Sequence, residues 1–203
     1  MLQACRDRGV SRLVLVSTIA VKFADLRRYP YAEAKKNAEA VVRDSGVGHL
    51  IVRPTMVLGE GSPILAALEK LAGLPVMPVF GHGRTPVQPV HVDDLVAVLE
   101  STVREAAYDG RVLEVGGPTR LSIESLLRAI RRRLKGKEGP VLHLPLGPLL
   151  PLLAAGETVA FNAMPFTVGQ MATFRFDGTA DEAKLPSIQV GRDIDAMIGG
   201  EPR

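Results

Sequence analysis

Several residue types are scarce or absent in this chain of 203 residues. It has no tryptophan, aromatic residues make up only 4% of it, and Cys5 is its single cysteine. One cysteine cannot build a disulfide framework, which excludes small disulfide-stapled secreted domains and fits a reducing compartment. Hydrophobic residues reach 46%, so the chain can bury a core, and with few aromatics that core must be mainly aliphatic.

Long apolar runs and a strong charge of one sign are also missing. Residues 1–8 lack the apolar middle of a signal peptide, and the apolar residues 145–155 are too few to span a bilayer and contain three prolines. The net charge is +3, and the basic run at residues 131–137 has no RNA-binding aromatic motif beside it. We interpret this run as a solvated helix end, where cations are favourable. We therefore expect a cytoplasmic protein with no nucleic-acid partner and no integral membrane segment.

Two kinds of ligand site are not indicated by the sequence. The glycine pairs at positions 46/48, 59/61 and 81/83 each lack a third glycine at the spacing of a Gly-x-x-Gly-x-x-Gly loop, which holds a pyrophosphate at a helix N-terminus. No second histidine or carboxylate spacing around His91 and Asp94 suggests a metal site, so we interpret both residues as structural.

The pattern that is present alternates apolar runs with amphipathic segments. The runs predict strands at residues 13–16, 49–52, 76–80, 112–115 and 141–144. The amphipathic segments predict helices at residues 2–8, 31–44, 62–72, 95–105 and 124–134, with Asp93 and Ser122 as N-caps of the last two. This alternation favours an α/β fold with a parallel sheet over residues 1–145, followed by a small C-terminal lobe or tail at 146–203.

Tyr31 and Lys35 lie four residues apart in a predicted helix and therefore share one face. A phenol titrates near pH 10 in water, and a neighbouring ammonium lowers that pKa, which suits a tyrosine for proton transfer. Such a pair is also common on exposed helix faces. It gains weight here from its order: Thr18 follows one strand, the pair follows on a helix, and Arg53 and Pro54 end the next strand.

Five ordered motifs then carry a resemblance to a known superfamily. They are residues 9–18, Tyr31-x-x-x-Lys35, and residues 53–59, 90–94 and 114–118. Together they resemble the catalytic and C-terminal part of an extended or atypical short-chain dehydrogenase/reductase, the superfamily of nucleotide-sugar epimerases and dehydratases. Residues 164–170 and 177–180 more loosely resemble the branch related to the 39-kDa subunit of complex I.

This resemblance implies a partial Rossmann-type parallel sheet and chemistry with NAD or NADP. By it, Tyr31 is the catalytic acid/base, Lys35 lowers its pKa and binds the nicotinamide ribose, and Thr18 binds the substrate hydroxyl. The segment around Arg53 and Pro54 lines the nicotinamide pocket. The implied reaction is hydride transfer at a carbinol or carbonyl of a small-molecule substrate, such as a nucleotide sugar.

The chain departs from the superfamily at its start, because the first strands and the glycine loop are not in it. The outer edge of the strand at residues 13–16 is then expected to be open, and open apolar edges aggregate or recruit another chain. We interpret the chain as a fragment or truncated form with impaired cofactor binding. A separately encoded chain or another copy would cover the edge.

Three functions remain open at this point. The first is an NAD(P)-dependent epimerase/dehydratase or reductase, inactive as this chain alone. The second is a non-catalytic assembly subunit like the complex I relative. The third, a flavin-free reductase associated with quinone or lipid, rests only on the apolar residues 145–155.

Overall fold

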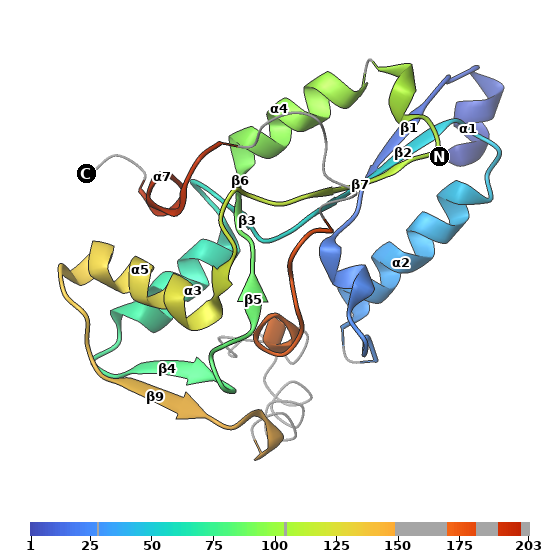
Figure 1. Cartoon of the computed structure of the whole chain (residues 1–203). Helices are drawn as coiled ribbons and strands as arrows, with labels where there is room; N and C mark the ends of the chain where they lie inside the picture. The colour runs from blue at the N-terminus through green and yellow to red at the C-terminus, as the bar shows by residue number, and fades with distance from the viewer. Residues whose placement is uncertain (28, 104, 149–169, 182–190, 200–203) are drawn as a thin grey trace.

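A parallel three-stranded sheet lies at the centre of the N-terminal part of the fold. The computed structural model describes residues 1–27, 29–103, 105–148, 170–181 and 191–199 (Figure 1). The sheet consists of β1 (Leu13–Val16), β2 (His49–Pro54) and β7 (Val112–Val115), in the order β1-β2-β7. All pairings are parallel, so the carboxyl ends of the three strands meet at one edge.

Helices cover both faces of this sheet (Figure 1). On one face, α4 (Val92–Val103) packs its buried Leu95 and Val98 into an apolar cluster with Leu50, Val52 and other strand residues. On the opposite face, α2 (Pro30–Arg43) lies over the strands. The α/β class and the parallel sheet expected from the sequence are confirmed.

The other elements are short paired strands, two longer helices and several short helices. The strand pairs are β3 (Val57–Leu58) with β6 (Val90–His91), β4 (Met77–Phe80) with β9 (Val141–Leu144), and β5 (Pro86–Val87) with β8 (Leu121–Ser122). The helices are α1 (Leu2–Asp7), η1 (Ile19–Lys22), α3 (Pro63–Gly73), η2 (Ala106–Tyr108), α5 (Ile123–Lys135), η4 (Gln170–Phe174) and α7 (Ile194–Ile198).

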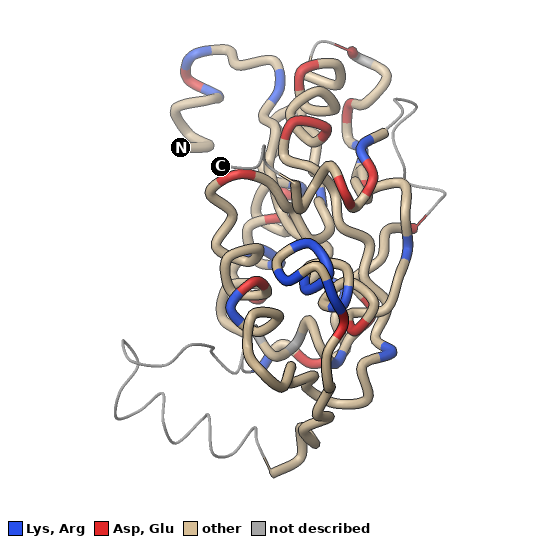
Figure 2. The backbone as a smooth tube through the Cα atoms, turned by 90° about the vertical axis from the view of Figure 1, so that its left-hand side faces the viewer, with Lys and Arg blue, Asp and Glu red and all other residues tan. Residues whose placement is uncertain are grey.

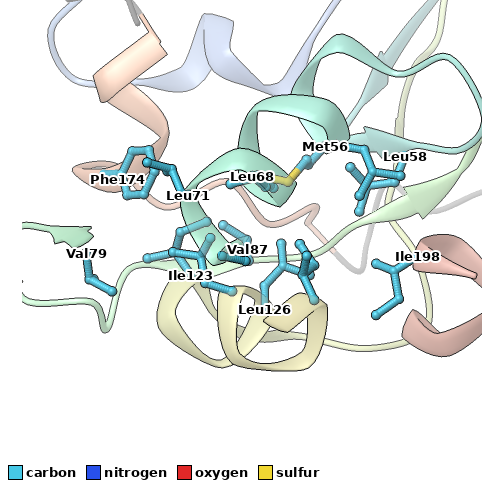
Figure 3. Close-up of a cluster of buried hydrophobic side chains, with 14 of the residues drawn as sticks. Met56, Leu58, Leu68, Leu71, Val79, Val87, Ile123, Leu126, Phe174 and Ile198 are labelled. Carbon is cyan, nitrogen blue, oxygen red and sulfur yellow. The ribbon is translucent and has the colours of Figure 1, made fainter. Parts of the chain in front are cut away.

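A second apolar cluster lies between α3 and α5 (Figure 3). Leu68 from α3 and Leu126 from α5 are buried in it, and Phe174 of η4 contacts Phe80 edge-on at a ring distance of 5.0 Å. Ile198 of α7 joins the same cluster. Described residues from beyond position 145 therefore help to build this core, while the division into residues 1–145 and 146–203 stays a prediction.

Most predicted elements appear within two or three residues of their expected ends, and the strands at 13–16, 112–115 and 141–144 are confirmed as predicted. Ser122 is confirmed as the N-cap of α5, because its Oγ accepts a 3.0 Å hydrogen bond from the N–H of Ser125. Asp93 as the N-cap of α4 is wrong. The helix begins at Val92, and His91 Nδ1 accepts the N–H of Asp93 at 3.1 Å instead.

The basic run on α5 is only partly a solvated helix end. Lys and Arg do gather at the end of this helix (Figure 2), but Arg131 is just 6% exposed. Its guanidinium donates to the carbonyl oxygens of Ala72, Leu74 and Pro75, at the C-terminus of α3. The prediction failed for this residue because a C-terminal helix end inside the fold also attracts a cation.

Two further sequence predictions concern residues that lie mainly outside the described ranges. The proline-rich segment at 145–155 and the motif at 164–170 fall mainly on residues outside them. Within the described part, no helix has both the length and the apolar character needed to cross a membrane.

Candidate active site

Thr18 and Lys35 both lie at the carboxyl end of β1. Lys35 Nζ donates a 2.8 Å hydrogen bond to the carbonyl oxygen of Val16, the last residue of that strand. Two residues later, the Oγ1 of Thr18 accepts the N–H of Ala20 at 3.3 Å and so caps η1. The carboxyl ends of parallel strands are where open α/β sheets bind their ligands. Both residues thus lie where a ligand is expected.

Tyr31 stands in the first turn of α2 and is 52% exposed. Its ring centroid lies 5.8 Å from Lys35 Nζ, so the pair shares one helix face as predicted. The ring of Tyr29 lies 6.0 Å from that of Tyr31. Burial, and then the neighbouring Tyr31, raise the pKa of the Tyr29 phenol above its ordinary value. Tyr29 therefore stays protonated beside the candidate acid/base.

Arg53 is directed away from solvent, with a side chain only 14% exposed. Its Nε and Nη2 donate to the two carboxylate oxygens of Glu39 at 2.9 and 2.6 Å, and its Nη1 donates to Glu114 at 3.4 Å. The hydrogen bonds to Glu39 raise the pKa of Arg53 further above its ordinary value. Pro54, the next residue, is buried. The contact of Arg53 and Pro54 with a nicotinamide ring stays a prediction.

Two carboxylates are buried beside this arginine, Glu39 at 1% exposure and Glu114 at 0%. Arg43 Nη2 also donates to Glu39 at 2.7 Å, and Lys22 Nζ donates to Glu114 at 2.8 Å. We call Lys22, Glu39, Arg43, Arg53 and Glu114 the buried ion cluster. Isolated carboxylates are very costly to bury, so these pairings are what makes their burial tolerable.

Hydrogen bonds determine the direction in which the pKa of Glu39 is shifted. Burial alone raises the pKa of this carboxyl, but the hydrogen bonds from Arg53 and from the hydroxyl of Ser17 (2.6 Å) outweigh it. The pKa of Glu39 therefore lies below its ordinary value, and the group is ionised at neutral pH.

Sequence reasoning missed the buried ion cluster, although two signals for it exist. Glu114 interrupts an apolar strand that is buried along its length, where a charge requires a partner. Glu39 lies four residues beyond Lys35 and eight beyond Tyr31, so it continues their face of α2. Either signal marks a carboxylate facing the sheet.

Residues 170–181, which we call the C-terminal strap, reach the same edge of the sheet. The N–H of Asp181 donates to Glu114 Oε2 at 2.8 Å, and the N–H of Ala180 donates to the buried Gln88 at 3.0 Å. The ring of Phe176 lies 5.4 Å from that of Phe23, directly after η1. The strap therefore borders the region of Thr18.

His91 and Asp94 have local partners at the N-terminus of α4. His91 accepts the N–H of Asp93, and Asp94 accepts the N–H of Arg192 at 3.0 Å and also pairs with its guanidinium. Across the described ranges, no group of three His, Cys, Asp or Glu residues is placed to hold a metal ion.

The two ends of a nicotinamide dinucleotide fit this chain differently. An ammonium has three N–H donors, and the bond to Val16 takes one, so Lys35 can also serve a ribose hydroxyl. A pyrophosphate needs a glycine loop before a helix, and this sequence has none with that spacing. The residues present fit the nicotinamide end and not the pyrophosphate end.

Comparison with known proteins gives matches of three kinds. Residues 1–70 match the family described as NAD(P)H-binding. The chain is 26% identical over 181 residues to the mitochondrial NADH dehydrogenase (ubiquinone) 1 alpha subcomplex subunit 9 of Arabidopsis thaliana, covering 87% of this chain and 43% of that protein. It is 25% identical over 148 residues to the chloroplastic divinyl chlorophyllide a 8-vinyl-reductase of Zea mays, covering 71% and 36%. The chain thus spans less than half the length of these relatives.

Solved structures share the fold at lower identity. An NADPH-dependent quinone oxidoreductase from Escherichia coli matches with a TM-score of 0.70 and 16% identity, over 97% of this chain and 70% of that one. A nucleoside-diphosphate-sugar epimerase from Staphylococcus aureus matches with 0.67 and 14%, over 100% and 65%. A UDP-glucuronic acid 4-epimerase from Bacillus cereus, in complex with UDP-glucuronic acid and NAD, matches with 0.57 and 17%, over 71% and 52%.

These matches agree with the resemblance read from the motifs. The family match, the complex I relative and the epimerase folds confirm the similarity to short-chain dehydrogenase/reductase proteins and the Rossmann-type fold. The roles of Thr18, Tyr31 and Lys35 are not decided by them and remain predictions.

Proposed function

Because this chain is similar to NAD(P)-binding short-chain dehydrogenase/reductase proteins in sequence and fold, we propose that it is the catalytic part of an NAD(P)-dependent epimerase/dehydratase or reductase. The observation that carries the proposal is the position of Lys35. Its ammonium is tied to the carboxyl end of β1 while it lies 5.8 Å from the ring of Tyr31.

In this function Tyr31 moves a proton to or from the oxygen of a substrate carbinol or carbonyl. The bound NAD(P) would supply or accept the hydride. Lys35 places its positive charge beside the Tyr31 ring, and its remaining donors hold the ribose. Thr18 orients the substrate oxygen from the loop after β1. A nucleotide sugar is the substrate class that the epimerase folds favour.

The test is Tyr31→Phe, which removes only the phenolic oxygen. Turnover of the intact, full-length protein is measured with NADH or NADPH against nucleotide sugars and quinones, and its cofactor binding by nicotinamide fluorescence, because this chain alone is expected to be inactive. We expect turnover to fall by about 10²- to 10⁴-fold, the usual contribution of a general acid/base, with cofactor binding retained. Tyr29→Phe is the matched control, since it removes the same atom two residues away and should leave turnover close to that of the wild type.

A second candidate is a non-catalytic assembly subunit, which the relative from an NADH dehydrogenase subcomplex favours. In the described residues β1 pairs with β2 alone, and Val16 and the nearby Val10 are 39% and 42% exposed. Another chain or a second copy would cover this edge. Under this candidate the wild type shows no turnover, and Tyr31→Phe leaves partner binding unchanged. Equal turnover of Tyr31→Phe and wild type would contradict the enzymatic proposal directly.

A further inference from the structure

The buried ion cluster touches both segments that carry the candidate catalytic residues. Glu39 shares the α2 face of Tyr31 and Lys35, at spacings of eight and four residues. Its carboxylate accepts from Ser17 Oγ at 2.6 Å and takes two hydrogen bonds from Arg53. This one side chain therefore joins α2 to the end of β1 and to β2.

Thr18 is held from both sides by the same set of contacts. Ser17, directly before it, bonds Glu39 through its hydroxyl and Val52 through its N–H, at 2.7 Å for the latter. Lys22, which ends the η1 turn that Thr18 caps, is paired with Glu114 in β7 at 2.8 Å. A shift of α2 along the sheet would have to break the hydrogen bonds of Glu39 to Ser17 and Arg53.

A buried ion cluster of this kind contributes little net stability to a fold. Replacing a buried ion group by packed apolar residues is often neutral or stabilising, whereas directional, charge-assisted hydrogen bonds fix geometry. Proton and hydride transfer depend on reacting groups held to within fractions of an ångström. The hydrogen bond of Glu39 to Ser17, the residue before Thr18, matches that need.

We propose that Glu39 is a positioning residue, which locks α2 against β1 and β2 so that Tyr31, Lys35 and Thr18 keep one mutual arrangement. The inference rests on the proposed function for its catalytic meaning, but the geometry it asserts can be measured without any turnover. Glu39 itself touches neither substrate nor cofactor in this role.

The experiment compares Glu39→Gln with wild type in the full chain labelled with ¹³C in the tyrosine rings. The amide keeps the shape of the side chain but places an NH₂ donor against the donors of an arginine. We expect the Tyr31 ring resonances to shift while those of Tyr108, in the α4 cluster, stay in place. In the active protein, kcat should fall about 10- to 100-fold with little change in KM, as for an interaction needed only in the transition state.

Two more variants complete the test, a milder one at the same contact and a control on another helix. Ser17→Ala removes a single hydroxyl and serves if Glu39→Gln does not fold; it should shift the same resonances and lower kcat by about 3- to 10-fold. Glu124→Gln is the control, because Glu124 also takes two hydrogen bonds from an arginine, Arg128, but on α5. It should leave Tyr31 and kcat unchanged.

The outcomes separate the two proposals. Tyr31 resonances at wild-type positions in both Glu39→Gln and Ser17→Ala overturn the positioning role, whatever the enzyme does. An intact wild-type protein that never turns over defeats the proposed function, while shifted Tyr31 resonances would still support the positioning role of Glu39. Equal losses from Glu124→Gln would show a general effect of stability and overturn the specific role of Glu39.

Discussion

The two faces of the β1-β2-β7 sheet differ in the side chains near the carboxyl ends of the strands, which are apolar on one face and charged on the other. On the α4 face, Leu50 and Val52 are completely buried in an apolar cluster, which Leu95 and Val98 complete. On the α2 face of the same strands, Arg53 pairs with Glu114 of β7 and with Glu39 of the covering helix. One strand, β2, therefore contributes Leu50 and Val52 to an apolar core on one side, and on the other side it carries the buried Ile51 followed by the charged Arg53 at its carboxyl end.

The difference separates two contributions of buried residues, the stability of the fold and the fixed geometry of its atoms. Apolar burial is non-directional and contributes about 25 cal/mol per Å², so it stabilises the α4 side without fixing one arrangement of atoms. Buried ions contribute little net stability but allow few alternative geometries. The face with the charged side chains is the one that carries Tyr31 and Lys35.

The largest effect is expected from Arg53→Met, which keeps the volume but leaves Glu39 and Glu114 buried without their shared partner. We expect a loss of about 3–5 kcal/mol in the free energy of unfolding, measured by urea denaturation at pH 7. Replacing all three groups together, as Glu39→Leu, Arg53→Met and Glu114→Leu, should recover most of that loss. A triple variant as unstable as Arg53→Met would mean that the cluster does stabilise the fold, and the contrast between the faces would weaken.

The apolar face was largely predictable from the sequence, and the charged face was not. Strands at 13–16 and 112–115 follow from unbroken apolar runs, and the α4 and α5 helices follow from their periodicity. The short strands β3, β5, β6 and β8 were missed, because two-residue strands leave no periodic signal. Their pairing is set by tertiary contacts.

The candidate site also has a part that could be predicted from the sequence and a part that could not. The spacing of Tyr31 and Lys35 was enough to place them on one face of α2, and Lys35 bonds Val16, two residues before Thr18. The partners of Arg53 were hidden, because Glu39 and Glu114 lie 14 and 61 residues away from it in sequence. Long-range ion pairs of this kind depend on strand order, which a single sequence leaves open.

A somewhat smaller effect is expected from Leu50→Ala on the apolar face. Removal of a fully buried leucine leaves a cavity and should lower the free energy of unfolding by about 2–5 kcal/mol. The Tyr31 ring resonances should nevertheless stay at their wild-type positions, because the cavity opens on the α4 side. Urea denaturation and the ¹³C tyrosine spectra together check this. A shift of Tyr31 in this variant would show that both faces position the site.

The smallest effect concerns the acid dependence of stability contributed by Glu39. The pKa of Glu39 in the folded protein lies below its ordinary value of 4.5, so in acid the unfolded chain binds its proton first. The contribution is therefore complete above about pH 4.5 and is lost as the pH falls through the folded pKa. Wild type should exceed Glu39→Gln in unfolding free energy by about 1.5–3 kcal/mol at pH 7, the range for hydrogen bonds to a charged group.

That difference is best followed by urea denaturation of the two proteins side by side at pH 7, 5, 4 and 3. Since all other carboxyl groups are common to both, their acid sensitivity cancels, and the remaining difference reports Glu39. It should be constant between pH 7 and 5 and shrink below that. A difference in unfolding free energy that instead stays constant down to pH 3 would contradict this prediction. It would show that the shape of the glutamate, and not its charge, holds α2 on the sheet, as shape and packing do on the α4 face.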